Sequence, residues 1–409
     1  MSASLSRNRD FNVFWLGQGF SSLGDAVALI AVPLLVLQST GSLARMGLVT
    51  ALAGVGSLVM GVVAGPVVDR YDRRRLMVRC DLGRFLVYGL VPIAWAVLGP
   101  NLWIVYAATL VGSALAMLFG VAYITAVANL VDRDQITEAN GRLQATYALA
   151  FVLGPMVAGL VSGRFGGATA IGIDAFTFLV SALSLRFVRL RPPAPREGAH
   201  PAERAGVLGE FLAGVRFLVE EPVFRWLTIV VGALAFLSTG INDLIIYFLR
   251  QDLGEPDRTV GIVFGIASLG AVASGILVAP LRRRLGFGPL FVAGVVVSGL
   301  ALVAAGRSAT WAGLALVAVV FTFSDSTRGV VTMSLRQELT PDHLLGRVTA
   351  AFWTVFAVPG PIGAVLLTQL GERIGATTAL SLVGAVVLAI AVVAALSPVR
   401  ARNPRVVKS

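Results

Sequence analysis

Long apolar runs recur along the whole chain, and each is long enough to cross a membrane. An apolar helix of about 20 residues spans the roughly 30 Å hydrocarbon core of a bilayer. Only 13% of the 409 residues are charged, against roughly 25% in soluble domains. The chain is therefore predicted to be an all-α integral membrane protein with twelve transmembrane helices, at about 11–38, 46–68, 76–98, 102–129, 142–163, 168–190, 224–249, 259–281, 287–306, 310–335, 347–370 and 375–397.

A polar stretch divides the predicted spans into two sets of six. Residues 191–206 form a Pro-rich linker, and 208–219 carry apolar side chains at helical spacing, which is typical of a helix lying along a membrane surface. The sequence therefore predicts an N-terminal six-helix bundle over 1–190 and a cytoplasmic linker with an amphipathic helix over 191–222. A C-terminal six-helix bundle with a cytoplasmic tail follows over 223–409.

The positive charges predict the orientation of the spans. If both termini are cytoplasmic, 25 of the 33 Lys and Arg residues fall on the cytoplasmic side and six on the opposite side. Cytoplasmic loops of membrane proteins carry such an excess. The net charge of +11 is therefore explained by topology and by contact with anionic lipid, and no nucleic-acid partner is expected.

The two halves of the chain resemble each other. Segments 131–159 and 339–364 both place loop residues before a Gly-Arg pair and then a span that contains Gly-Pro. Segment 61–75 has a counterpart at 275–286, which keeps the glycine and arginines but has Ala279 at the position of an aspartate. Two related halves predict a pair of pseudo-symmetric six-helix bundles.

The loop between the spans at 46–68 and 76–98 holds the most specific motif of the chain. Its signature positions are Gly65, Asp69, Arg70, Arg73 and Arg74. Their spacing resembles the signature loop of the major facilitator superfamily, although Asp72 stands where that pattern has glycine. The resemblance covers the whole chain through the twelve-span layout and implies the major facilitator fold.

Two interpretations of this loop are open. The arginines alone are explained as a cytoplasmic orientation signal. Gly65, however, would permit close backbone approach, and Asp69 could accept hydrogen bonds from the N-terminus of a neighbouring helix. A contact that forms in one arrangement of the bundles and breaks in another would make this loop a cytoplasmic gate.

A second motif lies in the span at 142–163. Gly154, Pro155 and Gly159 partly resemble the antiporter motif of drug-exporting members, with Ala150 and Ala158 in place of glycines of the fullest pattern. Proline bends a membrane helix, and glycine allows tight packing. An ordinary kinked helix explains the same residues, whereas the antiporter interpretation favours export over uptake.

Charged side chains inside spans are costly and are candidate functional groups. The candidates for proton coupling or substrate binding are Asp25, Asp243, Asp325 and Arg328. Asp25 and Asp243 occupy equivalent spans of the two halves, which in the resembled fold line a central cavity. A carboxylate that is hydrated in one state and desolvated in another changes its proton affinity, as coupling requires. Asp325 and Arg328 are three residues apart, so a structural ion pair is the alternative for them.

The remaining intramembrane charges are interpreted as structural. They are Asp81, Arg84 and Asp174, and Arg84 is a candidate brace for the loop at 69–75. Aromatic side chains on the spans that would line the cavity could form an adaptable apolar pocket, although contact with lipid or with a neighbouring helix is the better explanation for any single one of them. They are Trp15, Phe20, Tyr123, Tyr147, Phe236, Phe321, Phe323, Trp353 and Phe356.

Neither an ATP-driven nor an enzymatic mechanism is indicated by the sequence. A P-loop needs a Gly-Lys-Ser/Thr core, and Lys408 is the only lysine. Cys80 is the only cysteine, and no Cys/His spacing predicts a metal site. The chain is therefore expected to use no cofactor and either to be driven by an ion gradient, with a proton gradient as the expected energy source, or to move its solute downhill.

These features together predict a secondary transporter of a bacterial inner membrane. The stretch RDFNVFWLGQGFSSLGD at 9–25 resembles the twelve-span branch of drug, macrolide and siderophore exporters. That resemblance implies export of amphipathic or drug-like small molecules by proton antiport. The expected partners are a small-molecule substrate, protons and membrane lipid, and the expected state is a monomer. The alternatives are a transporter of another cargo, such as a lysophospholipid or a nutrient taken up by symport, and a non-transporting membrane receptor.

Overall fold

The computed structural model describes residues 5–132, 135–190, 207–341 and 344–404 as helices joined by loops, with no strand in these ranges. Contacts divide the chain into two compact units. One comprises Met1–Pro195 with Glu255–Gly265, and the other comprises Arg196–Gly254 with Ile266–Ser409. Twelve helical segments of the described ranges are long and apolar enough to cross a membrane. The predicted all-α membrane fold with twelve spans is therefore confirmed.

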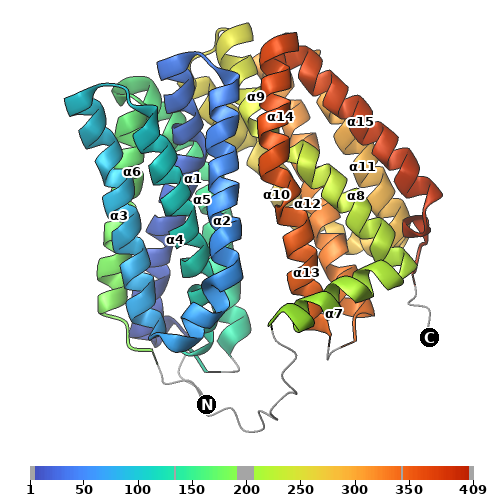
Figure 1. Cartoon of the computed structure of the whole chain (residues 1–409), viewed down its shortest axis with the longest axis horizontal. Coiled ribbons are helices and arrows are strands. Elements are labelled where there is room, and N and C mark those ends of the chain that lie inside the picture. Colours follow the sequence, from blue (N-terminus) through green and yellow to red (C-terminus); the bar gives the residue numbers. More distant parts are fainter. Residues whose placement is uncertain (1–4, 133–134, 191–206, 342–343, 405–409) are drawn as a thin grey trace. The chain divides into compact units, whose positions relative to one another are not determined.

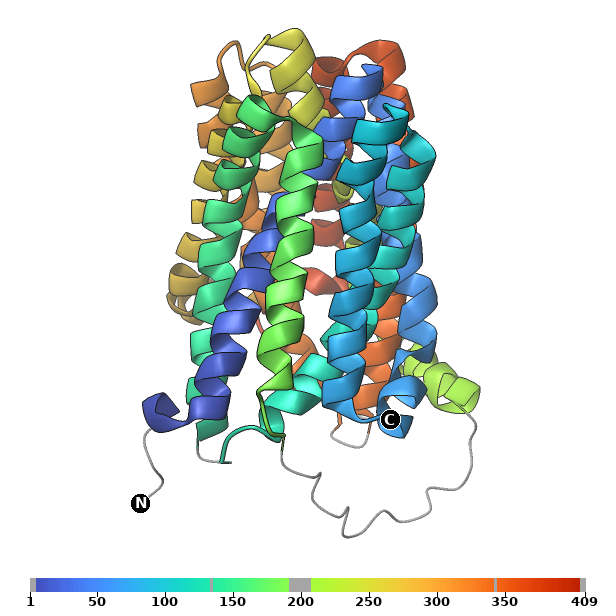
Figure 2. The ribbon, with the colours of Figure 1, turned by 90° about the vertical axis from the view of Figure 1, so that its left-hand side faces the viewer.

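The N-terminal unit is a bundle of long helices joined by short loops. They are α1 (Arg9–Thr40), α2 (Leu43–Arg70), α3 (Arg73–Leu98), α4 (Leu102–Ala128), α5 (Ile136–Phe165) and α6 (Gly167–Arg186) (Figure 1). α6 packs between α1 and α3 on the face of this unit seen in Figure 2, α5 packs on α1, and α4 packs on α2 and α3. This packing places charged side chains of α1, α3 and α6 side by side.

Side-chain caps define where several of these helices begin. The Asn8 side chain accepts a hydrogen bond from Phe11 N at 3.0 Å at the start of α1. The Asp72 side chain accepts from Arg75 N at 2.8 Å at the start of α3. Asp72 is the residue that departs from the family pattern of the loop, and its capping of α3 gives that departure a local physical reason.

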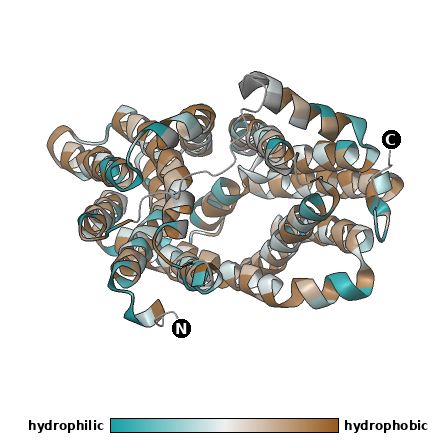
Figure 3. Ribbon diagram, turned by 90° about the horizontal axis from the view of Figure 1, so that it is seen from below, coloured by the Kyte–Doolittle hydropathy of each residue, from teal (hydrophilic) through white to brown (hydrophobic). Residues whose placement is uncertain are grey.

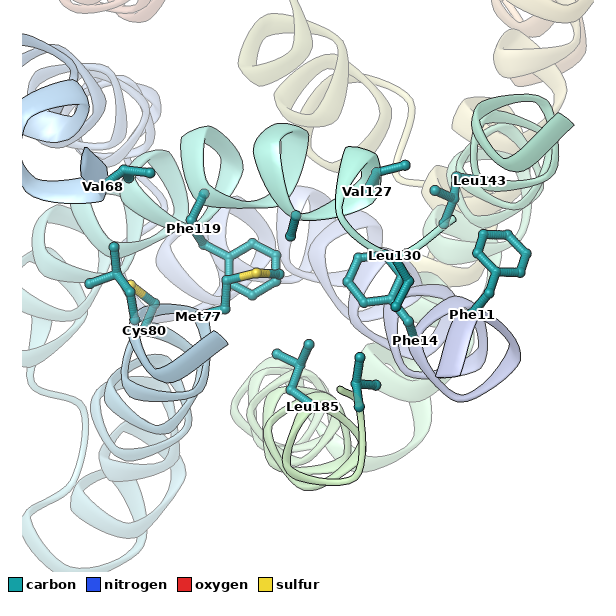
Figure 4. Packing of buried hydrophobic residues seen from close by; sticks show 14 of the residues in the cluster. Phe11, Phe14, Val68, Met77, Cys80, Phe119, Val127, Leu130, Leu143 and Leu185 are labelled. Atoms are coloured by element: carbon teal, nitrogen blue, oxygen red, sulfur yellow. The ribbon is translucent and has the colours of Figure 1, made fainter. Parts of the chain in front are cut away.

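An apolar cluster of large side chains holds one end of the N-terminal unit together (Figure 4). Phe11 and Phe14 of α1 lie in it together with two leucines. Leu130 follows the end of α4, and Leu185 belongs to α6. The ring of Tyr123 stacks on Phe14 with centroids 5.5 Å apart. Tyr123 is thus a packing residue of this cluster, which fixes α1 against α4 and α6.

The C-terminal unit begins with the amphipathic helix predicted at 208–219, which is α7 (Val207–Glu220). The helices that follow it are α8 (Pro222–Ser238), α9 (Ile241–Tyr247), the π-helix η3 (Phe248–Asp252), α10 (Asp257–Leu285), α11 (Phe287–Ala305), α12 (Trp311–Leu339), α13 (Leu345–Ala357), α14 (Pro359–Ile374) and α15 (Ala376–Leu396). Viewed along the helices, apolar residues predominate in the ribbons of both units (Figure 3).

Two predicted spans of the C-terminal half are interrupted helices. The span predicted at 224–249 comprises α8, α9 and η3, and the span predicted at 347–370 comprises α13 and α14, which meet at Pro359. Proline removes a backbone donor and disfavours helical geometry in the residue before it. Close packing accompanies the second break, because a Cβ at Gly363 would lie 1.8 Å from Phe236 O.

Candidate functional site

Three helices of the N-terminal unit bring four charged side chains together within the spans. Arg84 of α3 donates from Nη2 to Oδ1 of Asp25 on α1. Its Nη1 lies 4.0 Å from Oδ1 of Asp81, one turn earlier on α3. Asp174 of α6 interacts electrostatically with both Arg84 and Asp25. One guanidinium group therefore lies among three carboxyl groups. We call these four side chains the Arg84 cluster.

The members of the Arg84 cluster differ in their access to the surface of the unit. The side chain of Asp25 is 43% exposed, whereas that of Arg84 is 5% exposed. Asp81 and Asp174 are fully buried, and their carboxylate oxygens have no hydrogen-bond partner among the described residues. An unpaired charge in such a place is costly, so these two acids need either the charge of Arg84 or a bound proton. Asp25 is the exposed end of the cluster.

Close packing of α6 on α1 and α3 builds this arrangement. A Cβ at Gly24 would lie 2.1 Å from Oγ1 of Thr177 and 2.5 Å from Oδ1 of Asp174, so glycine allows α6 to bring its acid against α1. The guanidinium carbon of Arg84 lies 3.6 Å from the ring centroid of Phe178, a cation–π contact that partly replaces hydration. The sequence predicts only a structural role for Arg84, Asp81 and Asp174 and does not predict that they gather around Asp25.

Arg84 does not brace the loop at 69–75, as the sequence suggested, because its guanidinium group points to Asp25. The loop is held instead by Arg74, whose Nη1 donates to Val188 O at 3.0 Å and so joins the start of α3 to the end of α6. The separation in sequence explains the error, since Arg84 lies about three turns into α3.

The other residues of the predicted gate lie at the ends of α2 and α3. Arg70 is exposed in the last turn of α2, and Arg73 is the first residue of α3. The Asp69 side chain lies outside the described part of the structure. A Cβ at Gly65 would meet no heavy atom of the described unit within 4 Å. The close approach predicted at Gly65 is therefore not made within this unit, and the gate role stays a prediction.

The partial antiporter motif of α5 consists of close-packing positions. A Cβ at Gly154 would lie 2.4 Å from Cβ of Ala26, the neighbour of Asp25 on α1. A Cβ at Gly159 would lie 2.9 Å from Cα of Gly261, which belongs to the part of α10 that is included in the N-terminal unit. Pro155 is buried between these two contacts. The motif therefore holds α5 against α1 on one side and the start of α10 on the other.

The charged candidates of the C-terminal unit lie on α9 and α12. Arg328 donates from Nη2 to Oδ1 of Asp325, so the ion pair considered for these residues is present. Asp243 lies in α9 and is only 1% exposed. Asp25 and Asp243 occupy equivalent spans in the sequence, and the structure shows that they differ in exposure. Asp25 pairs with Arg84.

A cavity of about 160 Å³ lies within the C-terminal unit between α8, α12 and α13. Its polar lining comes mostly from α12, with Asp325, Arg328, Thr332 and Arg336, and includes Ser238 of α8. Of the predicted pocket aromatics, Trp353 lines it. In the sequence, Arg336 counts only as one of the orientation charges. Its spacing from Asp325, Arg328 and Thr332 places it on the same face of one helix, which is the signal that was missed.

Comparison with known proteins finds similarity to a family of membrane transporters. The sequence matches the Major Facilitator Superfamily over residues 14–364 and again over 228–408. The chain belongs to this superfamily. Members of the superfamily with similar sequences include the enterobactin exporter EntS of Escherichia coli K12. EntS is 26% identical to this chain over 403 residues, which are 97% of this chain and 93% of EntS. The multidrug efflux pump Tap of Mycolicibacterium fortuitum is 25% identical over 362 residues, 86% of this chain and 87% of Tap.

Solved transporters share the architecture at lower identity. The nucleoside transporter NupG superposes with a TM-score of 0.76 at 13% identity and covers 95% of this chain and 98% of its own. A bacterial homologue of the iron transporter ferroportin, in its inward-facing state, gives 0.72 at 18% identity over 96% and 98%. The predicted major facilitator fold and the resemblance to bacterial exporters are confirmed, and the chain is a multi-pass membrane transporter of this superfamily.

Proposed function

We propose that this transporter exports amphipathic small molecules in exchange for protons, by alternating access, from a bacterial inner membrane with both termini in the cytoplasm. The Arg84 cluster carries the proposal. One guanidinium group within the spans can balance the charge of only one of its three carboxyl groups, so the other two are sites that hold protons. Similarity to an enterobactin exporter and a multidrug efflux pump supports export as the direction.

The proposed exchange starts at the exposed end of the cluster. Arg84 balances one carboxylate, so the buried acids carry protons while Asp25 is ionised and paired. When a proton reaches Asp25, its charge is lost and the guanidinium group turns to Asp81, 4.0 Å from Nη1. Asp81 then releases its proton. The cluster keeps its net charge while one proton enters and another leaves, and the change of partner alters the contact between α1 and α3.

The other predicted residues have supporting parts in this proposal. Asp243 is a second candidate for proton binding in the equivalent span of the C-terminal half. We propose the signature loop with Gly65, Asp69, Arg70, Arg73 and Arg74 as the cytoplasmic gate. Gly154, Pro155 and Gly159 would keep α5 packed on α1 during the exchange. No cofactor is required, since the proton gradient supplies the energy.

Substitution of Asp25 tests the proposal. In proteoliposomes with an acidic interior, we expect the wild type to accumulate norfloxacin or ethidium and Asp25→Asn to lose at least about 90% of that accumulation, because the exposed proton acceptor is removed. Asp10→Asn removes an acid from the first turn of the same helix and serves as the matched control. Uptake is followed by the fluorescence of each compound.

Three outcomes would contradict the proposal. Accumulation that is driven equally well with and without the pH gradient would indicate a carrier without proton exchange. Accumulation that requires an alkaline interior would indicate symport. Equal pH-driven accumulation by Asp25→Asn and the wild type would remove Asp25 from the coupling mechanism.

A further inference from the structure

Arg336 is a buried cation whose charge no carboxylate in the described ranges balances through an ion pair. It lies near the end of α12 and is 1% exposed. Its Nη2 donates to the sulfur of Met333 at 2.7 Å, and a thioether is a weak acceptor. Its Nε has no hydrogen-bond partner in the described part of the chain. The Arg336 charge is therefore largely uncompensated by polar groups.

The nearest acid on the same helix face cannot serve Arg336. Asp325 lines the same cavity but lies eleven residues earlier on α12, which is roughly 16 Å along a helix. It is also occupied by Arg328, so the two neutralise each other. The side chains of the cavity therefore carry one net positive charge, located at Arg336.

A second unsatisfied donor stands one turn from Arg336. The hydroxyl of Thr332 is buried without a hydrogen-bond partner among the described residues, and Thr332 lines the same cavity. Residues four apart on a helix lie on one face. The Arg336 guanidinium and the Thr332 hydroxyl thus offer two neighbouring donors, which match the two oxygens of a carboxylate.

Beside these donors the cavity has an apolar wall, and its volume suits one aromatic ring. Val231 and Ala235 of α8 line it, and the ring centroids of Phe352 and Trp353 lie 4.6 and 5.9 Å from the guanidinium carbon of Arg336. Its volume of about 160 Å³ is close to that of an apolar cavity that holds one benzene ring. A carboxylate joined directly to an aromatic ring combines the charge and the shape that this site requires.

We propose that the cavity lined by Thr332, Arg336 and Phe352 is a binding site for the aryl carboxylate group of an organic acid. The carboxylate accepts hydrogen bonds from Arg336 and Thr332, and its ring lies against Phe352 and Val231. A group bound at this site would be part of the transported solute, so this assignment of a chemical class to the cargo rests on the proposed transport function. A buried ligand anion would supply the charge partner that Arg336 lacks.

Calorimetric titration of the purified full chain with salicylate tests this site. We expect saturable binding to the wild type, weakened about tenfold or more in Arg336→Gln because a charge-assisted hydrogen bond is lost. Thr332→Val, which removes only the hydroxyl, should weaken binding several-fold. Arg307→Gln removes an exposed arginine outside the cavity and should bind as the wild type does. Benzamide, which has the ring without the charge, should bind the wild type no more tightly than salicylate binds Arg336→Gln.

Several results would overturn the assignment. They are an absence of saturable salicylate binding to the folded wild type, equal binding by Arg336→Gln, and equal affinity for salicylate and benzamide. If Arg336→Gln does not fold, Thr332→Val and the benzamide comparison decide the question. The titration needs no membrane and no gradient, so a failed site with intact pH-driven transport would leave the proposed function standing without an acid-binding pocket.

Discussion

Arg84→Gln should abolish pH-driven transport and lower the stability of the protein by about 2–4 kcal/mol. The substitution removes the cation that pairs with Asp25 and Asp81 and whose charge also acts on Asp174. Breaking a buried ion pair costs about 3–5 kcal/mol, and the partial exposure of Asp25 reduces this figure. Thermal unfolding in detergent and accumulation of norfloxacin in proteoliposomes measure the two effects separately.

A double substitution separates the two roles of Arg84. In Arg84→Gln with Asp25→Asn, the charge left behind on α1 is removed, so we expect part of the stability to return while transport stays absent. Arg282→Gln is the matched control, because it removes an arginine whose partner Glu338 is 57% exposed at its side chain. Such a pair contributes about 0–1 kcal/mol. Normal transport by Arg84→Gln would show that proton exchange does not involve this cluster.

Gly154→Ala should destabilise the protein by about 1–3 kcal/mol, although alanine favours helices over glycine by about 1 kcal/mol. The added Cβ would lie 2.4 Å from Cβ of Ala26 and 2.9 Å from its carbonyl carbon, so α5 and α1 must separate. Because Ala26 follows Asp25 directly, the displacement should also reduce pH-driven transport several-fold. The midpoint of thermal unfolding and the initial rate of accumulation are the readouts.

Gly141→Ala on the same helix is the control for this substitution. A Cβ at Gly141 would meet no heavy atom within 4 Å among the described residues, so only the helix propensity changes and the midpoint should stay the same or rise. A midpoint that rises equally in Gly154→Ala and Gly141→Ala would show that α5 does not pack tightly on α1. The partial antiporter motif would then have no packing role at Gly154.

Hydropathy and motif spacing predicted most of the fold. The twelve spans, the amphipathic helix at Val207–Glu220 and the family follow from apolar run length, helical periodicity and the loop at 65–74. The interruptions at Thr239 and Val358 were not predicted, because a helix that breaks within an apolar run keeps the same mean hydropathy. The prolines at 359 and 361 were the available signal for the second break.

The candidate site was predicted only in part. Asp25 was selected because it is a charge within a span, and the ion pair of Asp325 with Arg328 follows from their spacing. The pairing of Asp25 with Arg84, 59 residues away, depends on how α1, α3 and α6 are rotated about their axes. Hydropathy does not specify that rotation in helices that are apolar on nearly every side. Arg336 was overlooked because a charge near the end of a span resembles an orientation signal.

Proton movement driven by the solute alone tests the central claim most directly. Proteoliposomes containing the wild-type protein and a trapped pH-sensitive dye, with no initial ion gradient, are given norfloxacin outside. Proton exchange predicts that entry of the solute makes the interior more alkaline and that Asp25→Asn shows no such change. Entry of norfloxacin at the same rate without a pH change, acidification of the interior, or an unchanged response in Asp25→Asn would contradict the account.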